Sequence, residues 1–309
     1  MKILGIGNAI VDVICKVDES FISKNNLTKG TMKLIFEKKE FENILSNLKI
    51  EKTISGGSVA NSIVGLSQLG NEVGFIGKIS DDELGNKYED GLNKENVKYF
   101  YSKKKEILPT GTCLILVTPD SERTMCTFLG TAGQISEIDI DLEAIKKSEL
   151  IFLEGYLWDE GEPKKAFDKA INNAKKVAMS LSDQFCVDRH KSHFLNLVKE
   201  KLDITFANEG EIMSLIETKD FKDVISFAKK VGKLIIITRG EKGAISINKD
   251  EIIEIKAREN LNIVDLTGAG DLFAAGYLHG YINKFSSKEC LEKGNELSSK
   301  IIQQIGARI

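Results

Sequence analysis

The chain has 309 residues, 42% hydrophobic and 29% charged, a composition typical of globular proteins rather than disordered or fibrous ones. Its 43 basic and 46 acidic residues leave a net charge of −3, without the basic excess of nucleic-acid-binding proteins. No apolar run approaches the ~18 residues of a membrane span, so we expect no membrane partner. The five cysteines form no Cys-x-x-Cys pair, so we expect free thiols, as in a cytoplasmic protein, and no structural zinc.

Short apolar runs alternate with segments of helical apolar spacing along most of the chain. The strand-like runs are residues 2–6, 73–79, 150–153, 177–181, 204–207 and 234–238. The helical segments include residues 62–69, 82–95, 163–175 and 221–231. This alternation predicts an α/β fold of Rossmann type, with a mostly parallel sheet covered by helices on both faces.

Two regions, residues 12–36 and 110–128, break this alternation. Both contain β-type segments without an obvious helix between them, and Cys113–Thr118 is the clearest of these segments. We expect them to pair as a small β-sheet that projects from the core and acts as a lid. The whole chain, residues 1–309, is expected to form a single domain.

The strongest motif is Asp265-Leu266-Thr267-Gly268-Ala269-Gly270-Asp271, between a strand-like segment, 262–264, and an apolar helical one. Glycines at a loop-to-helix junction leave backbone N–H groups directed at one spot, with the positive helix end behind them, so we expect an anion site. Asp271 would repel a stored phosphate, but it suits a base that takes a proton from an attacking hydroxyl. A helix cap is the plainer interpretation of a lone Gly-x-Gly-Asp.

Four weaker motifs stand at the ends of predicted strands or at a helix start, where open α/β sheets bind ligands. They are Gly7-Asn8-Ala9-Ile10-Val11-Asp12, Gly56-Gly57-Ser58-Val59-Ala60-Asn61, Asn208-Glu209-Gly210-Glu211 and Thr238-Arg239-Gly240-Glu241-Lys242-Gly243. Taken singly, each is also compatible with an ordinary turn. Ile10 stands where a dinucleotide fingerprint has its third glycine, which disfavours a nicotinamide-dependent oxidoreductase.

Taken together and in this order, the motifs resemble the ribokinase family, also called the PfkB carbohydrate kinases, over nearly the whole chain. The resemblance implies ATP and Mg²⁺ as cofactors and transfer of the γ-phosphoryl group to a substrate hydroxyl. It implies that Asp271 is the catalytic base and that Gly268, Ala269 and Gly270 form the anion hole. The nucleotide contacts that it implies are Asn208, Thr238, Arg239, Gly240, Gly243 and Asn295, with Arg123 reaching the phosphates from the lid. Glu211 is implied to serve Mg²⁺ indirectly, and Asp265 with nearby carbonyls to form a K⁺ site.

Within the family, the likeness is greatest to adenosine kinases. Residues 7–12 are similar to their Gly-Asn-Pro-Leu-Leu-Asp opening, with Ala9 in place of proline, and residues 294–306 follow their final helix; Leu266 replaces a common threonine. The resemblance implies an apolar, stacking surface for a purine from Met32, Phe128 and Tyr156. The full implied substrate site is Asn8, Ile10, Asp12, Met32, Gly56, Gly57, Ser58, Asn61, Phe128 and Tyr156.

The leading hypothesis is therefore an adenosine kinase that makes AMP and ADP from adenosine and ATP. One alternative is a sugar kinase of the same family that acts on ribose, fructose or 2-keto-3-deoxygluconate. The other is a non-catalytic regulatory protein that binds a nucleoside or a sugar. The sequence leaves open whether the protein is a monomer or a homodimer.

Overall fold

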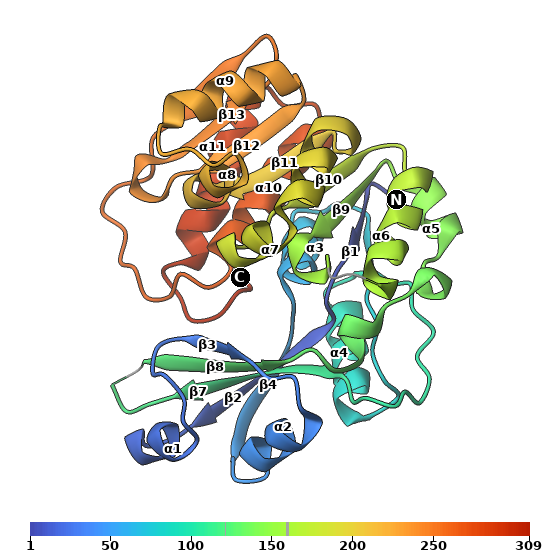
Figure 1. Cartoon of the computed structure of the whole chain (residues 1–309), viewed down its shortest axis with the longest axis vertical. Coiled ribbons are helices and arrows are strands. Elements are labelled where there is room, and N and C mark those ends of the chain that lie inside the picture. Colours follow the sequence, from blue (N-terminus) through green and yellow to red (C-terminus); the bar gives the residue numbers. More distant parts are fainter. Residues whose placement is uncertain (121, 159–160) are drawn as a thin grey trace.

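The computed structural model describes residues 1–120, 122–158 and 161–309, which form a large α/β layer and a smaller sheet with a gap between them (Figure 1). Within these ranges the large sheet has nine strands, in the order β14-β13-β12-β11-β10-β9-β1-β5-β6. Their bounds are β1 Ile3–Ile6, β5 Val73–Ile76, β6 Lys98–Tyr99, β9 Leu150–Glu154, β10 Val177–Ser180, β11 Ile204–Asn208, β12 Leu234–Thr238, β13 Ala244–Ile247 and β14 Ile252–Ile255.

The strands from β12 to β6 pair in parallel, and β13 and β14 add an antiparallel edge. Strands β1, β5 and β9 are buried along their whole length. Such continuous apolar runs are required where helices cover both faces of a sheet. The α/β prediction is thus confirmed.

Helices cover both faces of the large sheet, and each face has its own hydrophobic core. On one face lie α3 Ser58–Gln68, α4 Glu83–Lys94, α10 Ala269–Ile282 and α11 Ser287–Ile301. On the other lie α5 Leu142–Lys147, α6 Glu162–Asn173, α7 Gln184–Asn196, α8 Glu209–Leu215 and α9 Phe221–Val231. None of the helices in the described ranges is long and apolar enough to cross a membrane.

The small sheet has the strand order β3-β8-β7-β2-β4 in the described part of the chain. Its strands are β2 Ile10–Lys16, β3 Met32–Leu34, β4 Ile50–Gly56, β7 Gly111–Val117 and β8 Arg123–Phe128. Helices α1 Glu19–Lys24 and α2 Lys38–Leu45 pack on one face, and the other face lies opposite the large layer (Figure 1). A second, small sheet was predicted, but β4 lies outside the two predicted segments.

Two local expectations were wrong. A helix, α1, interrupts residues 12–36, because the Asp18 carboxylate accepts a hydrogen bond from the Phe21 N–H and caps it. Residues 262–264 are not a strand. They run exposed beside the end of α11, where the Val264 N–H donates to the Ile302 carbonyl.

Candidate active site

The residues of the predicted anion site lie at the start of α10. Gly268 has φ +78° and caps the helix, and a Cβ there would lie 2.7 Å from the Ala307 Cα, so only glycine fits. The N–H groups of a first helical turn have no partner within the helix, and the helix dipole makes this end positive. The space beside Gly270 is open. An anionic group such as a phosphate therefore fits this turn.

The Asp271 carboxylate is held in the first turn of α10 by two side chains of α3. Ser58 Oγ donates to Oδ1 at 2.6 Å, and Asn61 Nδ2 donates to Oδ2 at 3.0 Å. Ser62 Oγ donates to the backbone carbonyl of Asp271 at 2.9 Å. The Asp271 carboxylate is thus fixed next to the predicted anion site, and side chains of α3 set its orientation.

Gly57 brings the motif at residues 56–61 against the motif at residues 7–12. Its φ is +96°, and a Cβ would lie 2.2 Å from the Asn8 carbonyl oxygen, so α3 begins in contact with the loop after β1. Glu154, at the end of β9, ties both motifs together. Its carboxylate accepts the Asn8 N–H at 2.8 Å and the Val59 N–H at 2.9 Å, fully buried. Sequence reasoning missed Glu154, whose only signal is a charge directly after a buried strand.

Burial raises the pKa of the three carboxyl groups at this junction. It raises the pKa of Asp271 to about 6, although the hydrogen bonds from Ser58 and Asn61 oppose it. It raises the pKa of Asp12 to about 7 and that of Glu154 to about 7. A carboxylate with a pKa near 6 is still ionised at neutral pH and is a stronger base than an ordinary aspartate. Asp271 therefore suits proton abstraction from a hydroxyl group.

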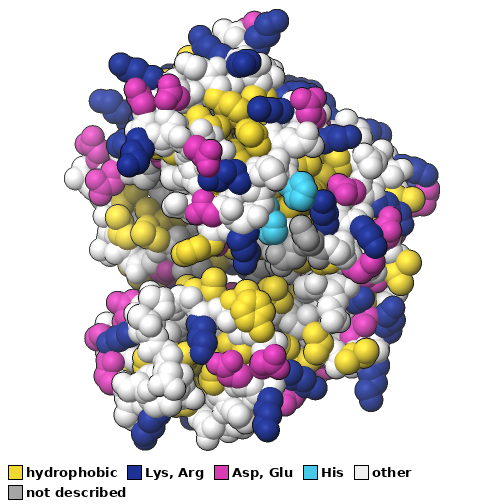
Figure 2. Space-filling view, in the orientation of Figure 1, with side chains coloured by type: hydrophobic (Ala, Val, Ile, Leu, Met, Phe, Trp, Pro, Cys, Tyr) yellow, Lys and Arg dark blue, Asp and Glu magenta, His cyan; other side chains and the backbone are white. Residues whose placement is uncertain are grey.

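Asp12 lies on the face of the small sheet that is turned toward the gap. It is in register with Cys113 of β7, and alternate residues such as Val11 and Val13 pack instead on the helix face. The gap face carries an apolar cluster of Ile10, Ile14, Cys113, Ile115, Val117, Met125, Leu129 and Ala132. Hydrophobic side chains lie on both sides of the hollow between the layers (Figure 2). A flat apolar ligand with polar groups at one edge fits this surface.

The three residues expected to form the purine surface are not together. Phe128 is 3% exposed and stacks on Phe41 at 5.1 Å between ring centroids, so it belongs to the helix face of the small sheet. The expectation for Phe128 was wrong because strand residues alternate between faces. Met32, 49% exposed, lies on β3, and Tyr156 of the large layer is half-buried, with its hydroxyl donating to the Ser182 carbonyl.

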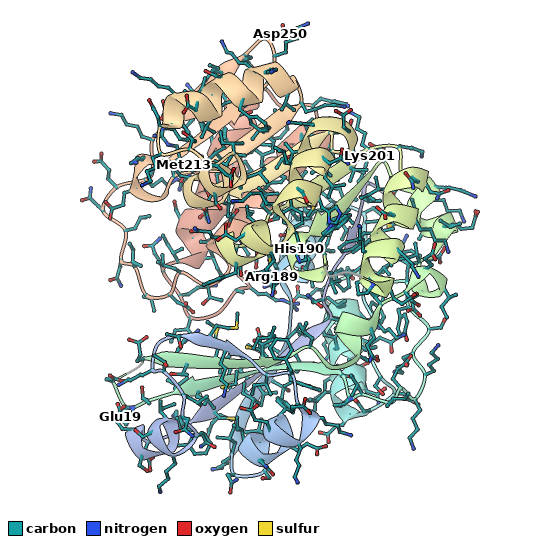
Figure 3. The ribbon with its side chains drawn as sticks, in the orientation of Figure 1. Glu19, Arg189, His190, Lys201, Met213 and Asp250 are labelled. Carbon is teal, nitrogen blue, oxygen red and sulfur yellow. The ribbon has the colours of Figure 1, made fainter. Side chains whose placement is uncertain are left out.

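Other side chains line the rim of the gap. Figure 3 shows Arg189 and His190, in the kinked α7 of the large layer, at the edge that faces the small sheet. A buried cluster of three charges follows β5, where Lys78 contacts Asp139 at 3.2 Å and Glu106 at 3.6 Å. The charges of Lys78, Asp139 and Glu106 neutralise one another, so these three side chains have a structural role.

The implied nucleotide motifs lie at the ends of β11 and β12. Asn208 and Glu211 form a capping box at the start of α8, in which the Asn208 N–H and Nδ2 occupy both Glu211 oxygens. Burial raises the pKa of Glu211 to about 7. With both oxygens engaged inside the protein, Glu211 fits only an indirect role toward a magnesium ion.

Arg239 is engaged within the protein and its side chain does not fit the expected nucleotide contact. It pairs with Glu209 at 2.9 Å and Glu254 at 2.6 Å, and lies over the Phe221 ring at 3.9 Å. Packing accounts for Gly243, since a Cβ there would lie 2.0 Å from the Ile255 carbonyl oxygen.

Two other implied nucleotide residues lie at an open turn, and a third is held within the protein. The turn at Gly240 borders open space, and Thr238 ends β12 beside it. Asn295 is engaged within the protein, since its Nδ2 donates to the Lys256 carbonyl at 3.0 Å and its Oδ1 accepts from the Ser299 Oγ at 3.5 Å. These positions keep their predicted roles as hypotheses.

Arg123 bridges the two layers. Its guanidinium pairs with the Asp265 carboxylate at 2.6 Å, so in this structure it contacts the anion-loop motif directly. Asp265 also accepts hydrogen bonds from Thr267 and from the Gly306 N–H. Burial acts to raise the pKa of Asp265, but these hydrogen bonds and the Arg123 charge lower it below its usual value.

In this structure the Asp265 carboxylate is engaged by a guanidinium, a hydroxyl and N–H donors. A potassium ion would take its ligands from Asp265 and from nearby backbone carbonyls, and this site stays a prediction. Across residues 1–120, 122–158 and 161–309, no group of three or more histidine, cysteine, aspartate or glutamate side chains could hold a metal ion.

Residues 302–309, which follow α11, cross the anion site. Ala307 packs over Gly268, and the Arg308 Nε donates to the Asn61 Oδ1 at 3.1 Å. Sequence reasoning missed Arg308, since no motif in the sequence marks it.

Comparison with known proteins agrees with this geometry. The chain is 36% identical to the crystal structure of adenosine kinase from Sinorhizobium meliloti, with a TM-score of 0.90, over 100% of this chain and 95% of that one. It is 34% identical to a probable sugar kinase from Rhizobium etli, with a TM-score of 0.88, over 99% and 94%. Adenosine kinase 2 of Arabidopsis thaliana is 24% identical over 98% of this chain and 94% of its own length. Residues 7–309 match the pfkB family of carbohydrate kinases, and the chain belongs to that family.

Proposed function

We propose that this chain is an ATP-dependent nucleoside kinase that phosphorylates the 5′-hydroxyl of adenosine. The observation that carries the proposal is the Asp271 carboxylate, fixed by Ser58 and Asn61 beside the open turn at Gly270. A base and an anion site within one helical turn are what phosphoryl transfer to a hydroxyl requires.

In the proposed reaction, ATP supplies the phosphoryl group. A magnesium ion, which Glu211 would serve indirectly, would supply neutralising charge to the phosphates when bound. Asp271 accepts the proton of the 5′-hydroxyl as its oxygen forms a bond to the γ-phosphorus. The bond from that phosphorus to the β–γ bridging oxygen breaks, which yields AMP and ADP. The N–H groups of Gly268 and Gly270 stabilise the negative charge on the transferred group. The Ala269 N–H, which was expected to join them, donates to the Leu266 carbonyl at 3.2 Å.

We propose that the substrate lies between Asp271 and the small sheet. Asp12 accepts hydrogen bonds from the ribose hydroxyls, with Asn8 and Asn61 beside it. The apolar cluster on the gap face around Ile115 and Met125 takes the nucleobase, with Met32 at its edge. This arrangement favours a nucleoside over a free sugar, which has no comparable apolar surface.

We propose that the small sheet is the lid of the site. Arg123 ties it to Asp265 in the anion-loop motif, and closure in this manner excludes water that would otherwise hydrolyse ATP. In this role Arg123 acts at the phosphate end of the site, as the resemblance implies.

A sugar kinase is the second candidate. The Asn8 Oδ1 is buried and without a hydrogen-bond partner in the described residues, so it is free to accept a hydroxyl of a sugar or a ribose. The 34% identity to a probable sugar kinase supports the same reaction class.

The test is ADP release by the purified protein with ATP and Mg²⁺. The acceptors are adenosine, inosine, guanosine, ribose, fructose and 2-keto-3-deoxygluconate. Fast turnover with adenosine supports the proposal, and fast turnover with a sugar alone supports the second candidate. Saturable binding of an acceptor without turnover would support a non-catalytic regulatory protein.

A further inference from the structure

The segment 302–309 places an arginine where the proposed chemistry takes place. It is fixed along α3 and the anion loop by three contacts: the Gly306 N–H to Asp265, Ala307 against Gly268, and the Gln68 Nε2 to the Ile309 carbonyl. Within the segment, the Gln304 Nε2 donates to the Arg308 carbonyl. The segment is therefore built onto the site.

Arg308 fixes the orientation of the Asn61 amide. Its Nε donates to the Asn61 Oδ1 at 3.1 Å, which leaves the Asn61 Nδ2 to donate to the Asp271 Oδ2 at 3.0 Å. With the amide rotated by 180°, its oxygen would face the Asp271 carboxylate and repel it. The hydrogen bonds from Arg308 to Asn61 and from Asn61 to Asp271 thus specify a single orientation of the base.

One nitrogen of the guanidinium has no partner in the described part of the chain. The Arg308 Nη2 is buried and donates to no acceptor among the described residues. A buried donor without an acceptor is costly, and such groups in binding sites are commonly satisfied by a ligand. The charge lies near both Asp12 and Asp271, the two carboxylates between which the acceptor substrate is proposed to bind.

We propose that Arg308 is a positioning residue of the phosphoryl-transfer site: its Nε orients Asn61 toward Asp271, and its Nη2 donates to an oxygen of the bound acceptor. The proposal rests on the proposed function. Arg308 also lowers the pKa of Asp12 and of Asp271 against the effect of burial. The other ionisable groups that interact with Arg308, Asp12 or Asp271 are Tyr88, Glu95, Cys113, Arg123, Glu154 and Tyr156.

Three variants separate the charge of Arg308 from its geometry. Arg308→Gln removes both, and Arg308→Lys keeps the charge but loses the fork of N–H donors. Lys300→Gln removes one positive charge from an exposed position in the last turn of α11 and serves as the control. Thermal unfolding of each variant reports whether it is folded.

In steady-state kinetics with the best acceptor, we expect Arg308→Lys to lose about 10-fold or more in kcat/KM, the value of one hydrogen bond to a charged group. The acid limb of its pH profile stays near that of the wild type. Arg308→Gln loses more, and its acid limb moves to higher pH. Equal activity and equal pH profiles for Arg308→Gln and Lys300→Gln would overturn the proposal.

A second measurement does not depend on turnover. NMR titration of protein labelled with ¹³C at the aspartate carboxyl carbons, assigned with Asp12→Asn and Asp271→Asn, follows both groups directly. Arg308→Gln is expected to raise both midpoints by about one pH unit, and Arg308→Lys to leave them near the wild-type values. Unchanged midpoints in Arg308→Gln would overturn the assigned position of Arg308. If the wild type phosphorylates none of the acceptors, the proposed function fails while this titration still decides the role of Arg308.

Discussion

Replacing Ser58 by alanine tests whether the proton-accepting group is Asp271 as the structure holds it. The Ser58 Oγ donates to the carboxylate Oδ1 at 2.6 Å, a hydrogen bond that favours the ionised form. A hydrogen bond to a charged group is worth about 1.5 kcal/mol or more, which corresponds to about one pKa unit. From a pKa of about 6, Ser58→Ala is therefore expected to raise the pKa of Asp271 to about 7.

The magnitude follows from the ionised fraction of Asp271. With midpoints of about 6 and about 7, the ratio of Ser58→Ala to wild-type kcat/KM falls about fivefold between pH 9 and pH 6, and about tenfold by pH 5. Asp12, with a pKa of about 7, titrates in both proteins and cancels in this ratio. The assay is kcat/KM for the best acceptor at each pH, with ATP saturating.

Ser62→Ala is the matched control. Ser62 lies one turn further along α3 and donates to the backbone carbonyl of Asp271, so its loss leaves the carboxylate pKa unchanged. The reasoning is refuted if Ser58→Ala and Ser62→Ala give the same ratio at every pH. A wild-type acid limb centred near pH 4 would refute it as well.

Two further predictions concern the small sheet. Phe128→Ala removes a buried ring stacked on Phe41 and is expected to lower the free energy of unfolding in urea by about 3–5 kcal/mol, with little change in acceptor KM. Met32→Ala, at a half-exposed position, should change the acceptor KM and leave the unfolding free energy nearly unchanged. An unchanged unfolding midpoint for Phe128→Ala would place that ring in the gap. Arg123→Ala breaks the pair with Asp265 and is expected to increase the ADP formed per phosphorylated product, because water enters a less tightly closed site. Lys29→Ala, which removes ion pairs at the outer edge of the small sheet, is its control, and an equal ADP-to-product ratio in both variants would contradict the lid hypothesis.

The core of the fold was predictable because its signals are local. Buried parallel strands appear as apolar runs, and β1, β9, β11 and β12 lie where those runs are. Strand β4 was missed because residues 50–53 of this edge strand are largely exposed and polar, so no alternation is visible. Its place in the sheet is set by pairing with β2.

The site was predictable in part for the same reason. The motifs at Gly7–Asp12, Gly56–Asn61 and Gly268–Asp271 follow strands or begin helices, and parallel strands bring such ends to one edge. The face of Phe128 was not predictable, because the parity of a strand is set by its partners, here Thr112 of β7.

Glu154 and Arg308 were missed because their contacts join distant parts of the chain. Glu154 binds backbone N–H groups 95 and 146 residues away, and Arg308 contacts a side chain 247 residues away. Local patterns carry no information on such pairs.

The most direct test of the central claim is the rate of phosphoryl transfer by Asp271→Asn. The asparagine keeps the size of the side chain and an oxygen that can accept from Ser58, but it cannot take a proton. With the best acceptor at pH 8, we predict that kcat falls by about 10²- to 10⁴-fold while the protein stays folded. A kcat within a few fold of the wild type would show that the acceptor hydroxyl loses its proton to another group, and would contradict the account.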